Sequence, residues 1–282
     1  MTQRPWIPYA LIAPSVIFLG VLFLYPLVQT IWLSFYSANG LGLENYRRML
    51  GDINFTAAVR NTFLLTLVVV PIQIVMAVMM AVMVQKLDRG RDLVLWIWTI
   101  PLAISDLAAG LAWLSILQNS GYLNSMLFGL GIIPDKVQWL TYETPLTLFA
   151  AIAIAEIWRA TAIVLIIIVA GLQLIPKDYA EAAEVFGATP WTRFRKITLP
   201  LLKPSLQSAL ILRTVLAFEV FSVVYALGGT NFPVLVGEAY TWQRVNQNDG
   251  VATAIAVLIM VVSLVSTLVY LKAVKVDPEH QP

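Results

Sequence analysis

Apolar residues dominate this chain in six long runs, which are separated by shorter polar segments. A helix that crosses the hydrocarbon core of a membrane needs about 20 mostly apolar residues. The six runs meet that length and lie at about 9–36, 61–85, 93–117, 145–172, 200–227 and 251–272. The pattern predicts an all-α integral membrane protein, with six transmembrane helices in a single transmembrane domain over residues 1–282.

Composition supports a membrane protein and excludes several other classes. Hydrophobic residues make up 59% of the 282 residues and charged residues 12%, whereas soluble proteins carry roughly 25% charged residues. The chain has no cysteine, which excludes disulfides and cysteine-ligated zinc, and no metal site is expected. The net charge is only +2, with the basic residues in short loops, so no nucleic-acid partner is expected.

Positive charges in the loops predict the orientation of the chain in the membrane. With a cytoplasmic N-terminus, the inner segments hold 11 basic residues and the outer segments hold 5. The inner set is Arg4, Lys86, Arg89, Arg91, Lys177, Arg193, Arg195, Lys196, Lys203, Lys272 and Lys275; the outer set is Arg47, Arg48, Arg60, Lys136 and Arg244. Because cytoplasmic loops are enriched in Lys and Arg, both termini are expected in the cytoplasm of a multi-pass membrane protein.

A polar island at 176–199 interrupts the apolar pattern between the fourth and fifth predicted spans. Pro176 ends the fourth span, and Asp178 can cap a new helix with Glu181 in capping-box spacing. Four small or aromatic residues then share one helical face: Tyr179, Ala182, Ala183 and Phe186. Gly187 can adopt the left-handed conformation that ends a helix. The island therefore predicts a short amphipathic helix on the cytoplasmic side.

Two interpretations of this short helix follow from its residues. An amphipathic helix can lie on the membrane surface with its apolar face in the lipid. Alternatively, a small face with alanines between aromatics suits close packing against another protein. Glu181 and Glu184 favour the second interpretation, because an anionic inner leaflet repels carboxylates.

The island also carries a signature at fixed spacing. Its fixed positions are Glu181, Ala182, Ala183, Gly187, Ile197, Leu199 and Pro200. This pattern resembles the signature loop of binding-protein-dependent ABC importer permeases. The flanking segments 170–176 and 199–204, and the segments 13–15, 24–26 and 43–46, resemble the carbohydrate-uptake branch. Within that branch, the start of the chain is similar to the first permease subunit of maltose, trehalose and glycerol-phosphate systems.

The resemblance implies a function and a set of partners. It implies that the island is a coupling helix, which docks into a cleft of a cytoplasmic ATPase and passes on ATP-driven movement through Tyr179, Phe186 and the signature residues. The implied partners are a second homologous permease, two ATPase subunits, an extracytoplasmic solute-binding protein and a sugar. This sequence contains no Gly-x-x-x-x-Gly-Lys-Ser/Thr phosphate-binding loop. The chain is therefore expected to be non-catalytic and without a cofactor, with ATP and Mg bound by the ATPases.

Charged residues inside the predicted spans are the candidates for the solute path. Ionisable groups at membrane depth usually face a cavity or one another. The charged candidates are Asp106, Glu156, Arg159, Arg213 and Glu219, and Trp158 and Tyr225 could stack on a sugar ring. Glu156 and Arg159 are three residues apart, so a local structural pair is the alternative for them. Arg213 and Glu219 share no helix face and need separate partners.

Other solutes and another transporter class stay open at this point. Arg159 and Arg213 could serve an anion such as glycerol phosphate, and a polyamine or another small solute is a further alternative. In a different class, an ion-coupled secondary carrier, the buried charges would be the coupling sites.

Overall fold

Helices make up nearly all of the structure, which is a computed structural model that describes residues 6–274. The termini, including Arg4 and Lys275 of the charge pattern, lie outside the described residues. The first half contains α1 (Ile7–Leu19), η1 (Gly20–Leu24), α2 (Tyr25–Phe35), β1 (Tyr36–Ser37), β2 (Gly40–Leu41), α3 (Glu44–Leu50), α4 (Phe55–Gln85), α5 (Arg91–Thr99), η2 (Ile100–Ala103), α6 (Asp106–Leu117) and α7 (Tyr122–Gly129). The second half contains α8 (Pro145–Gln173), α9 (Lys177–Val185), α10 (Pro190–Arg193), η3 (Phe194–Thr198), α11 (Leu199–Leu201), α12 (Lys203–Phe218), α13 (Ser222–Gly228), η4 (Gly229–Asn231), α14 (Leu235–Arg244) and α15 (Asp249–Ala273).

Within residues 6–274, four continuous helices are long and apolar enough to cross a membrane, and two bent pairs raise the number to six. The continuous spans are Tyr9–Phe35, Phe55–Gln85, Pro145–Gln173 and Asp249–Ala273. They coincide closely with the first, second, fourth and sixth predicted runs. The third and fifth predicted runs correspond to the bent pairs, so a six-span membrane fold agrees with the structure.

The two bent spans differ from the straight helices that apolarity predicts. The pair Arg91–Ala103 and Asp106–Gly129 is bent by 98°. Pro101 lies in the 3-10 turn before this bend, and Ser105 caps α6 by accepting a hydrogen bond from the Ala108 N–H at 3.2 Å. A proline without an N–H and a capping serine end one helix and begin another, whatever the apolarity of the run.

The fifth predicted run, 200–227, also differs from the structure. Its helix α12 ends at Phe218, and the apolar residues that follow form the separate short helix α13. At its other end, Pro190–Leu201 and Lys203–Phe218 meet at a bend of 66°. Pro200 and Pro204 flank that bend, and each lacks the N–H that would continue the hydrogen-bond ladder.

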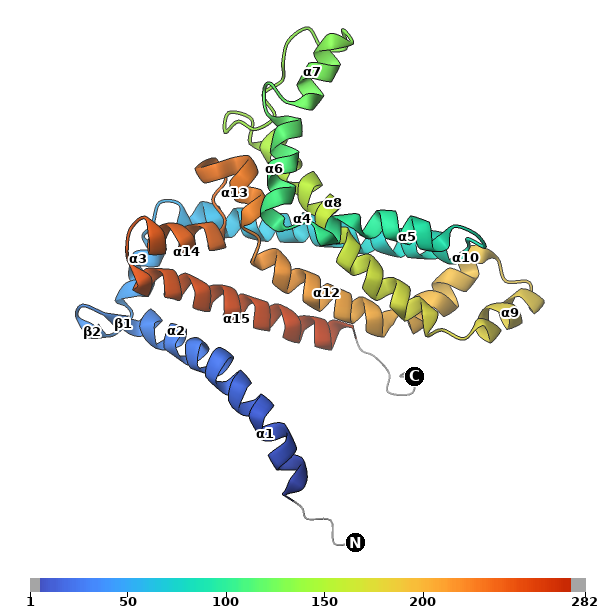
Figure 1. Cartoon of the computed structure of the whole chain (residues 1–282), viewed down its shortest axis with the longest axis horizontal. Coiled ribbons are helices and arrows are strands. Elements are labelled where there is room, and N and C mark those ends of the chain that lie inside the picture. The colour runs from blue at the N-terminus through green and yellow to red at the C-terminus, as the bar shows by residue number, and fades with distance from the viewer. Residues whose placement is uncertain (1–5, 275–282) are drawn as a thin grey trace.

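Figure 1 shows α4, α8, α12 and α15 running along the long axis of the molecule. The short helices α9 and α10 lie at one end of this bundle, and α3, α14 and the β1–β2 hairpin lie at the other (Figure 1). Three apolar cores hold the helices together: α4 with α6, α8 and α13; α3 and α4 with α14 and α15; and α4 with α8 and α12. The long helix α4 contributes to all three cores and is therefore the centre of the fold.

The end of the bundle opposite α9 is fastened by side chains that bond to the main chain. The buried Asn45 Nδ2 lies 2.8–3.2 Å from three carbonyls, those of Leu33, Ser34 and Tyr36. Asn61 Nδ2 donates to the Pro233 carbonyl at 3.0 Å, and Thr62 Oγ1 accepts from the Leu235 N–H at 3.0 Å. These bonds join the start of α4 to the turn before α14, and the start of α3 to the end of α2.

Candidate functional site

The first candidate site is α9, which the structure places in the polar island as predicted. The helix begins at Lys177, and Pro176 occupies the N-cap position with an extended backbone. Among the described residues no side chain caps α9, so the prediction of an Asp178 cap with a Glu181 capping box is wrong. Asp178 lies inside the first turn instead, where a carboxylate still stabilises the helix through its dipole.

The prediction that Gly187 ends the helix in a left-handed conformation is confirmed. Its φ is +72°. The Ala188 N–H donates to the Ala183 carbonyl and the Gly187 N–H donates to the Glu184 carbonyl, both at 2.9 Å. This pair of bonds is the Schellman motif. Among the described residues no atom outside the local chain lies within 4 Å of a Cβ built on Gly187, so the backbone alone requires glycine.

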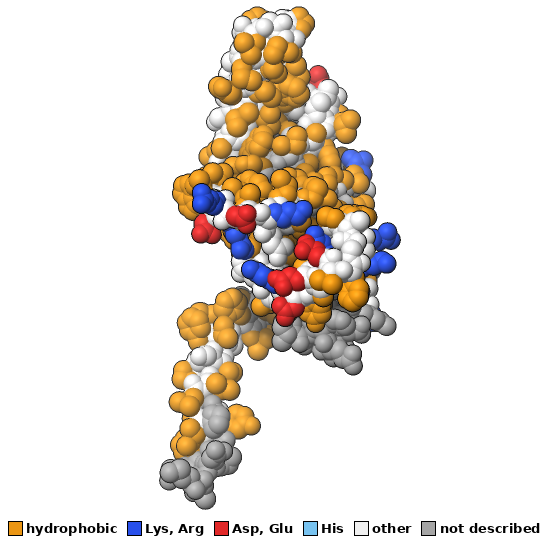
Figure 2. All heavy atoms as spheres, turned by 90° about the vertical axis from the view of Figure 1, so that its right-hand side faces the viewer, with side chains coloured by type: hydrophobic (Ala, Val, Ile, Leu, Met, Phe, Trp, Pro, Cys, Tyr) orange, Lys and Arg blue, Asp and Glu red, His pale blue; other side chains and the backbone are white. Residues whose placement is uncertain are grey.

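The predicted shared face of α9 is only partly the surface that the helix presents. Tyr179, Ala182 and Phe186 are exposed, with Phe186 at 90%, but Ala183 is buried against the chain itself. Val185, which the spacing did not single out, is 85% exposed. Figure 2 views this end of the molecule and shows acidic and basic side chains gathered on it, below a largely hydrophobic protrusion. Exposed apolar side chains mark an interaction surface when they form a patch rimmed by polar residues, and Val185 and Phe186 are exposed next to one another in sequence.

An ion pair between Glu184 and Arg193 fastens α9 to α10. Beyond α10, the signature residues Ile197 and Leu199 are half-buried, and Pro200 is exposed. The Leu199 N–H donates to the Phe194 carbonyl five residues earlier, which makes η3 a π-helical turn. Such a turn commonly accommodates a break in the regular ladder, here next to Pro200. The signature positions therefore lie on or directly after an exposed helix, and on the connection from it into α12.

The second candidate site is a charged cluster inside the bundle. Glu156 on α8 accepts hydrogen bonds from Arg213 on α12 at 3.1 Å and from Arg159 at 3.3 Å, both through Oε2. The predicted local pair of Glu156 and Arg159 is confirmed. Arg159 also donates to Asp106 at the start of α6 at 2.6 Å. Gln73 on α4, which the sequence did not point to, accepts from Arg213 Nε at 2.5 Å and donates to the Glu156 carbonyl at 2.8 Å.

The cluster is buried at one end and exposed at the other, and its charges balance. Glu156 and Arg213 are each 2% exposed, whereas Asp106 at the other end is exposed. Two carboxylates face two guanidinium groups, so the cluster is neutral as a whole. In the described part of the chain, three of its buried atoms have no hydrogen-bond partner: Glu156 Oε1, Arg159 Nε and Arg213 Nη1. The cluster thus joins four helices and keeps unused polar atoms that water or a polar solute can bind.

Within residues 6–274, the remaining candidates for the solute path take no part in the ion pairs and hydrogen bonds of the charged cluster. Trp158 is half-exposed and meets Trp113 edge to face, with ring centroids 6.0 Å apart. Tyr225 is exposed and belongs to an aromatic cluster with Phe221 and Tyr240, at centroid distances of 5.3 and 6.2 Å. Phe221 and Tyr240 are themselves 5.3 Å apart.

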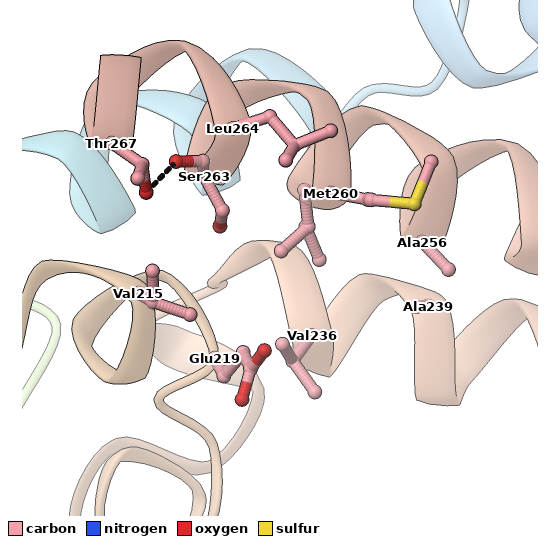
Figure 3. A pocket seen from close by; sticks show the side chains of 10 residues that line it. Val215, Glu219, Val236, Ala239, Ala256, Met260, Ser263, Leu264 and Thr267 are labelled. Atoms are coloured by element: carbon pink, nitrogen blue, oxygen red, sulfur yellow. Dashed lines mark hydrogen bonds between the residues drawn. The ribbon is translucent and has the colours of Figure 1, made fainter. Parts of the chain in front are cut away.

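Glu219 follows α12 and lines a separate cavity between α12, α14 and α15 (Figure 3). It forms no ion pair with any residue from 6 to 274, so it does not pair with Arg213 six residues earlier, as the spacing predicts. Within that range no group of three or more His, Cys, Asp or Glu residues could hold a metal ion.

The fold, the sequence signature at 181–200 and the comparisons with known proteins together define the class. Residues 61–273 match the family described as the binding-protein-dependent transport system inner membrane component. The chain belongs to this family, and it is therefore the membrane permease component of an ABC importer.

The individual similarities agree with that assignment. The chain is 34% identical over 276 residues to the trehalose/maltose transport system permease protein of Thermococcus litoralis, covering 94% of this chain and 92% of that protein. It is also 34% identical over 281 residues to the sulfoquinovosyl glycerol transport system permease protein of Agrobacterium fabrum, covering 94% and 89%.

A solved structure supports the fold. A chain of a bacterial ABC transporter that imports the acidic polysaccharide alginate superposes with a TM-score of 0.85, over 96% of both chains and at 24% identity. The resemblance drawn from the coupling signature is thereby confirmed at the level of family and fold.

Proposed function

We propose that this chain is the permease subunit that moves a sugar or oligosaccharide across the cytoplasmic membrane by alternating access, driven by separate ATPase subunits. In this mechanism ATP and Mg bind to the ATPases, and this chain supplies the docking helix and part of the solute path. Movement of the docked helix shifts the bundle between two states, since a switch of this kind needs a bistable element and a bias on it.

The observation that carries the proposal is the exposed apolar surface of α9. Tyr179, Val185 and Phe186 stand out from a helix that a Schellman motif and an ion pair hold in place. A rigid aromatic anchor of this kind is typical of the central contacts in protein interfaces. Glu181 on the same helix opposes burial in an anionic leaflet, which favours a protein cleft over lipid; the charge of Glu184 is already paired with Arg193.

Further partners follow from the same proposal. A solute-binding protein delivers the sugar from outside, a second permease completes the path, and two ATPases receive one coupling helix from each permease. With α9 facing the ATPases, both termini lie in the cytoplasm, which agrees with the distribution of Lys and Arg. The relatives named for trehalose, maltose and sulfoquinovosyl glycerol support a sugar-containing solute.

The docking role is tested by replacing Phe186 in the assembled transporter. Phe186→Asp should lower the amount of ATPase that copurifies with the tagged permease by roughly 30-fold, the effect expected when an interface anchor is lost. Ile53→Asp is the matched control, because Ile53 is equally exposed at 90% but lies between α3 and α4, at the opposite end of the bundle.

Uptake of labelled trehalose into proteoliposomes is measured in parallel, with binding protein and ATP supplied. Equal losses of ATPase in both variants, or none in either, would contradict docking through α9. Uptake by the isolated chain under an ion gradient would instead identify a secondary carrier.

A further inference from the structure

A cavity of about 650 Å³, separate from the one that Glu219 lines, opens where the ends of α4 and α8 meet the start of α5. Its volume falls in the range of small-molecule sites, which is roughly 300–1,000 Å³. Two candidate spans end at residues that line it, Gln85 and Gln173, and the apolar segment Arg91–Ala103 begins at a third, Arg91. All three segments therefore leave the hydrocarbon core at this cavity, which is the depth of lipid headgroups.

Four charged side chains line the cavity: Asp88, Arg91, Asp92 and Lys177. Two are anionic and two are cationic, so the cavity is neutral as a whole. None of the four forms an ion pair with any residue from 6 to 274. Unpaired charges of both signs around one cavity can each bind the opposite charge of a single ligand, which favours a zwitterion.

The lining below these charges is apolar and continues onto an exposed helical face. Ala81, Val84 and Leu172 line the cavity and are buried. Leu93 on α5 also lines it, but this side chain is 61% exposed and points the way out of the cavity along the helix.

Leu93 is the first member of an exposed apolar stripe. Trp96, Ile97 and Ile100 follow it at spacings of three, four and seven residues, so all four residues share one helical face. All four are exposed within the described part of the chain, and they belong to a segment that is apolar enough to enter the membrane. A charged cavity that continues into an apolar stripe matches a phospholipid, which joins a polar headgroup to acyl chains.

The charges of the cavity select the headgroup. A phosphate accepts hydrogen bonds from Arg91 and Lys177, and an ammonium group donates to the carboxylates of Asp88 and Asp92. Phosphoethanolamine carries both groups. Choline has no N–H to donate, and an anionic headgroup without an amine would leave both carboxylates unpaired.

We propose that this cavity binds the headgroup of phosphatidylethanolamine, with the acyl chains lying along the apolar stripe of α5. Lys177 is the first residue of α9, so the bound lipid joins the start of α9 to the ends of α4 and α8. The site does not depend on which solute the transporter moves.

The test titrates the complete transporter in detergent with phosphatidylethanolamine, phosphatidylcholine and phosphatidylglycerol of identical acyl chains, and native mass spectrometry counts the bound lipids. Phosphatidylethanolamine should bind most tightly. Arg91→Gln should weaken its binding on the order of ten-fold, as expected for the loss of a hydrogen bond to a charged group. Arg89→Gln is the matched control, because Arg89 is exposed in the same loop and does not line the cavity. Asp88→Asn/Asp92→Asn should remove the preference for phosphatidylethanolamine over phosphatidylcholine.

Three results would overturn the lipid site. One is equal weakening by Arg91→Gln and Arg89→Gln, or equal binding of the three lipids. Another is soluble glycerophosphoethanolamine binding as tightly as the lipid, which would show that the apolar stripe contributes nothing. The third is a cryo-EM structure of the complete transporter with a partner subunit filling the cavity. Sugar uptake enters none of these measurements, so the proposed function is judged separately.

Discussion

Removal of the Glu156 carboxylate should destabilise the bundle strongly, because it leaves a buried cation without a counter-charge. In Glu156→Leu, Arg213 keeps only the Gln73 oxygen at 2.5 Å as a partner, whereas Arg159 retains Asp106 at 2.6 Å. Breaking one side of a buried ion pair costs about 3–5 kcal/mol. That loss corresponds to roughly two to four orders of magnitude in the folding equilibrium constant.

The double variant Glu156→Leu/Arg213→Leu shows whether the destabilisation comes from the loss of the ion pair itself or from the unpaired buried charge that the single variant leaves. Replacing both members of a buried pair with apolar residues is often neutral or stabilising. The double variant should therefore be more stable than Glu156→Leu, with a total loss below about 2 kcal/mol after the Gln73 oxygen is left unpaired.

Equilibrium unfolding of the purified chain in mixed detergent measures these free energies. Glu44→Leu is the control, since the exposed Glu44–Arg48 pair at 3.0 Å should contribute no more than about 0.5 kcal/mol. The reasoning is refuted if the single variant loses less than about 1 kcal/mol, or if the double variant is no more stable than the single one.

Three further predictions concern other parts of the fold. Gly187→Val should lower the ratio of solute uptake to ATP hydrolysed, because the left-handed conformation costs a β-branched residue about 1–2 kcal/mol. Gly187→Asn should largely keep the ratio of the unmodified transporter. The same ratio in Gly187→Val and the unmodified transporter would contradict the assigned turn. Burial, assisted by Asp52, raises the pKa of Glu238 above its ordinary value of 4.5. The folded state then binds the proton more tightly than the unfolded state, so stability should fall as pH rises above 4.5. The melting temperature should therefore decrease between about pH 4 and 7. Glu238→Gln should remove this dependence of the melting temperature on pH. Asn45→Ala should cost about 1–3 kcal/mol, because three carbonyls lose their donor; an unchanged denaturation midpoint in detergent would show that water replaces the side chain.

Local patterns predicted the helices of this fold well, because the length of an apolar segment and the prolines and glycines that end a helix can be read directly from the sequence. The long spans follow from apolar runs of sufficient length, and the end of α9 follows from Gly187 and the residues around it. The start of α9 was misplaced by two residues, because Pro176 rather than Asp178 occupies the N-cap position and a proline is as compatible with a helix start as an aspartate. Apolarity alone could not locate the end of α12 at Phe218, since the residues after Glu219 are just as apolar.

Long-range pairing was beyond the reach of the sequence. Glu156 and Arg159 are three residues apart, so their contact was predictable, but Arg213 reaches Glu156 from 57 positions away. Gln73 stood out even less, because one amide in an apolar run carries no charge to signal its role. The cavity lined by Glu219 similarly depends on how α12, α14 and α15 meet, which a single sequence does not encode in any short pattern.

The hydrogen bonds of Asn45, Asn61 and Thr62 make the end opposite α9 a fixed rim. Displacement of α9 would pass through α8 and α12 to α4, which packs against both. The start of α4 is bonded to the turn before α14, where side-chain bonds to the main chain resist sliding. Helices that are held by hydrogen bonds at one end and displaced at the α9 end would tilt about the hydrogen-bonded end. Amide hydrogen exchange should therefore be slowest near the start of α4 and fastest around α9, so that protection maps the pivot of the transport cycle.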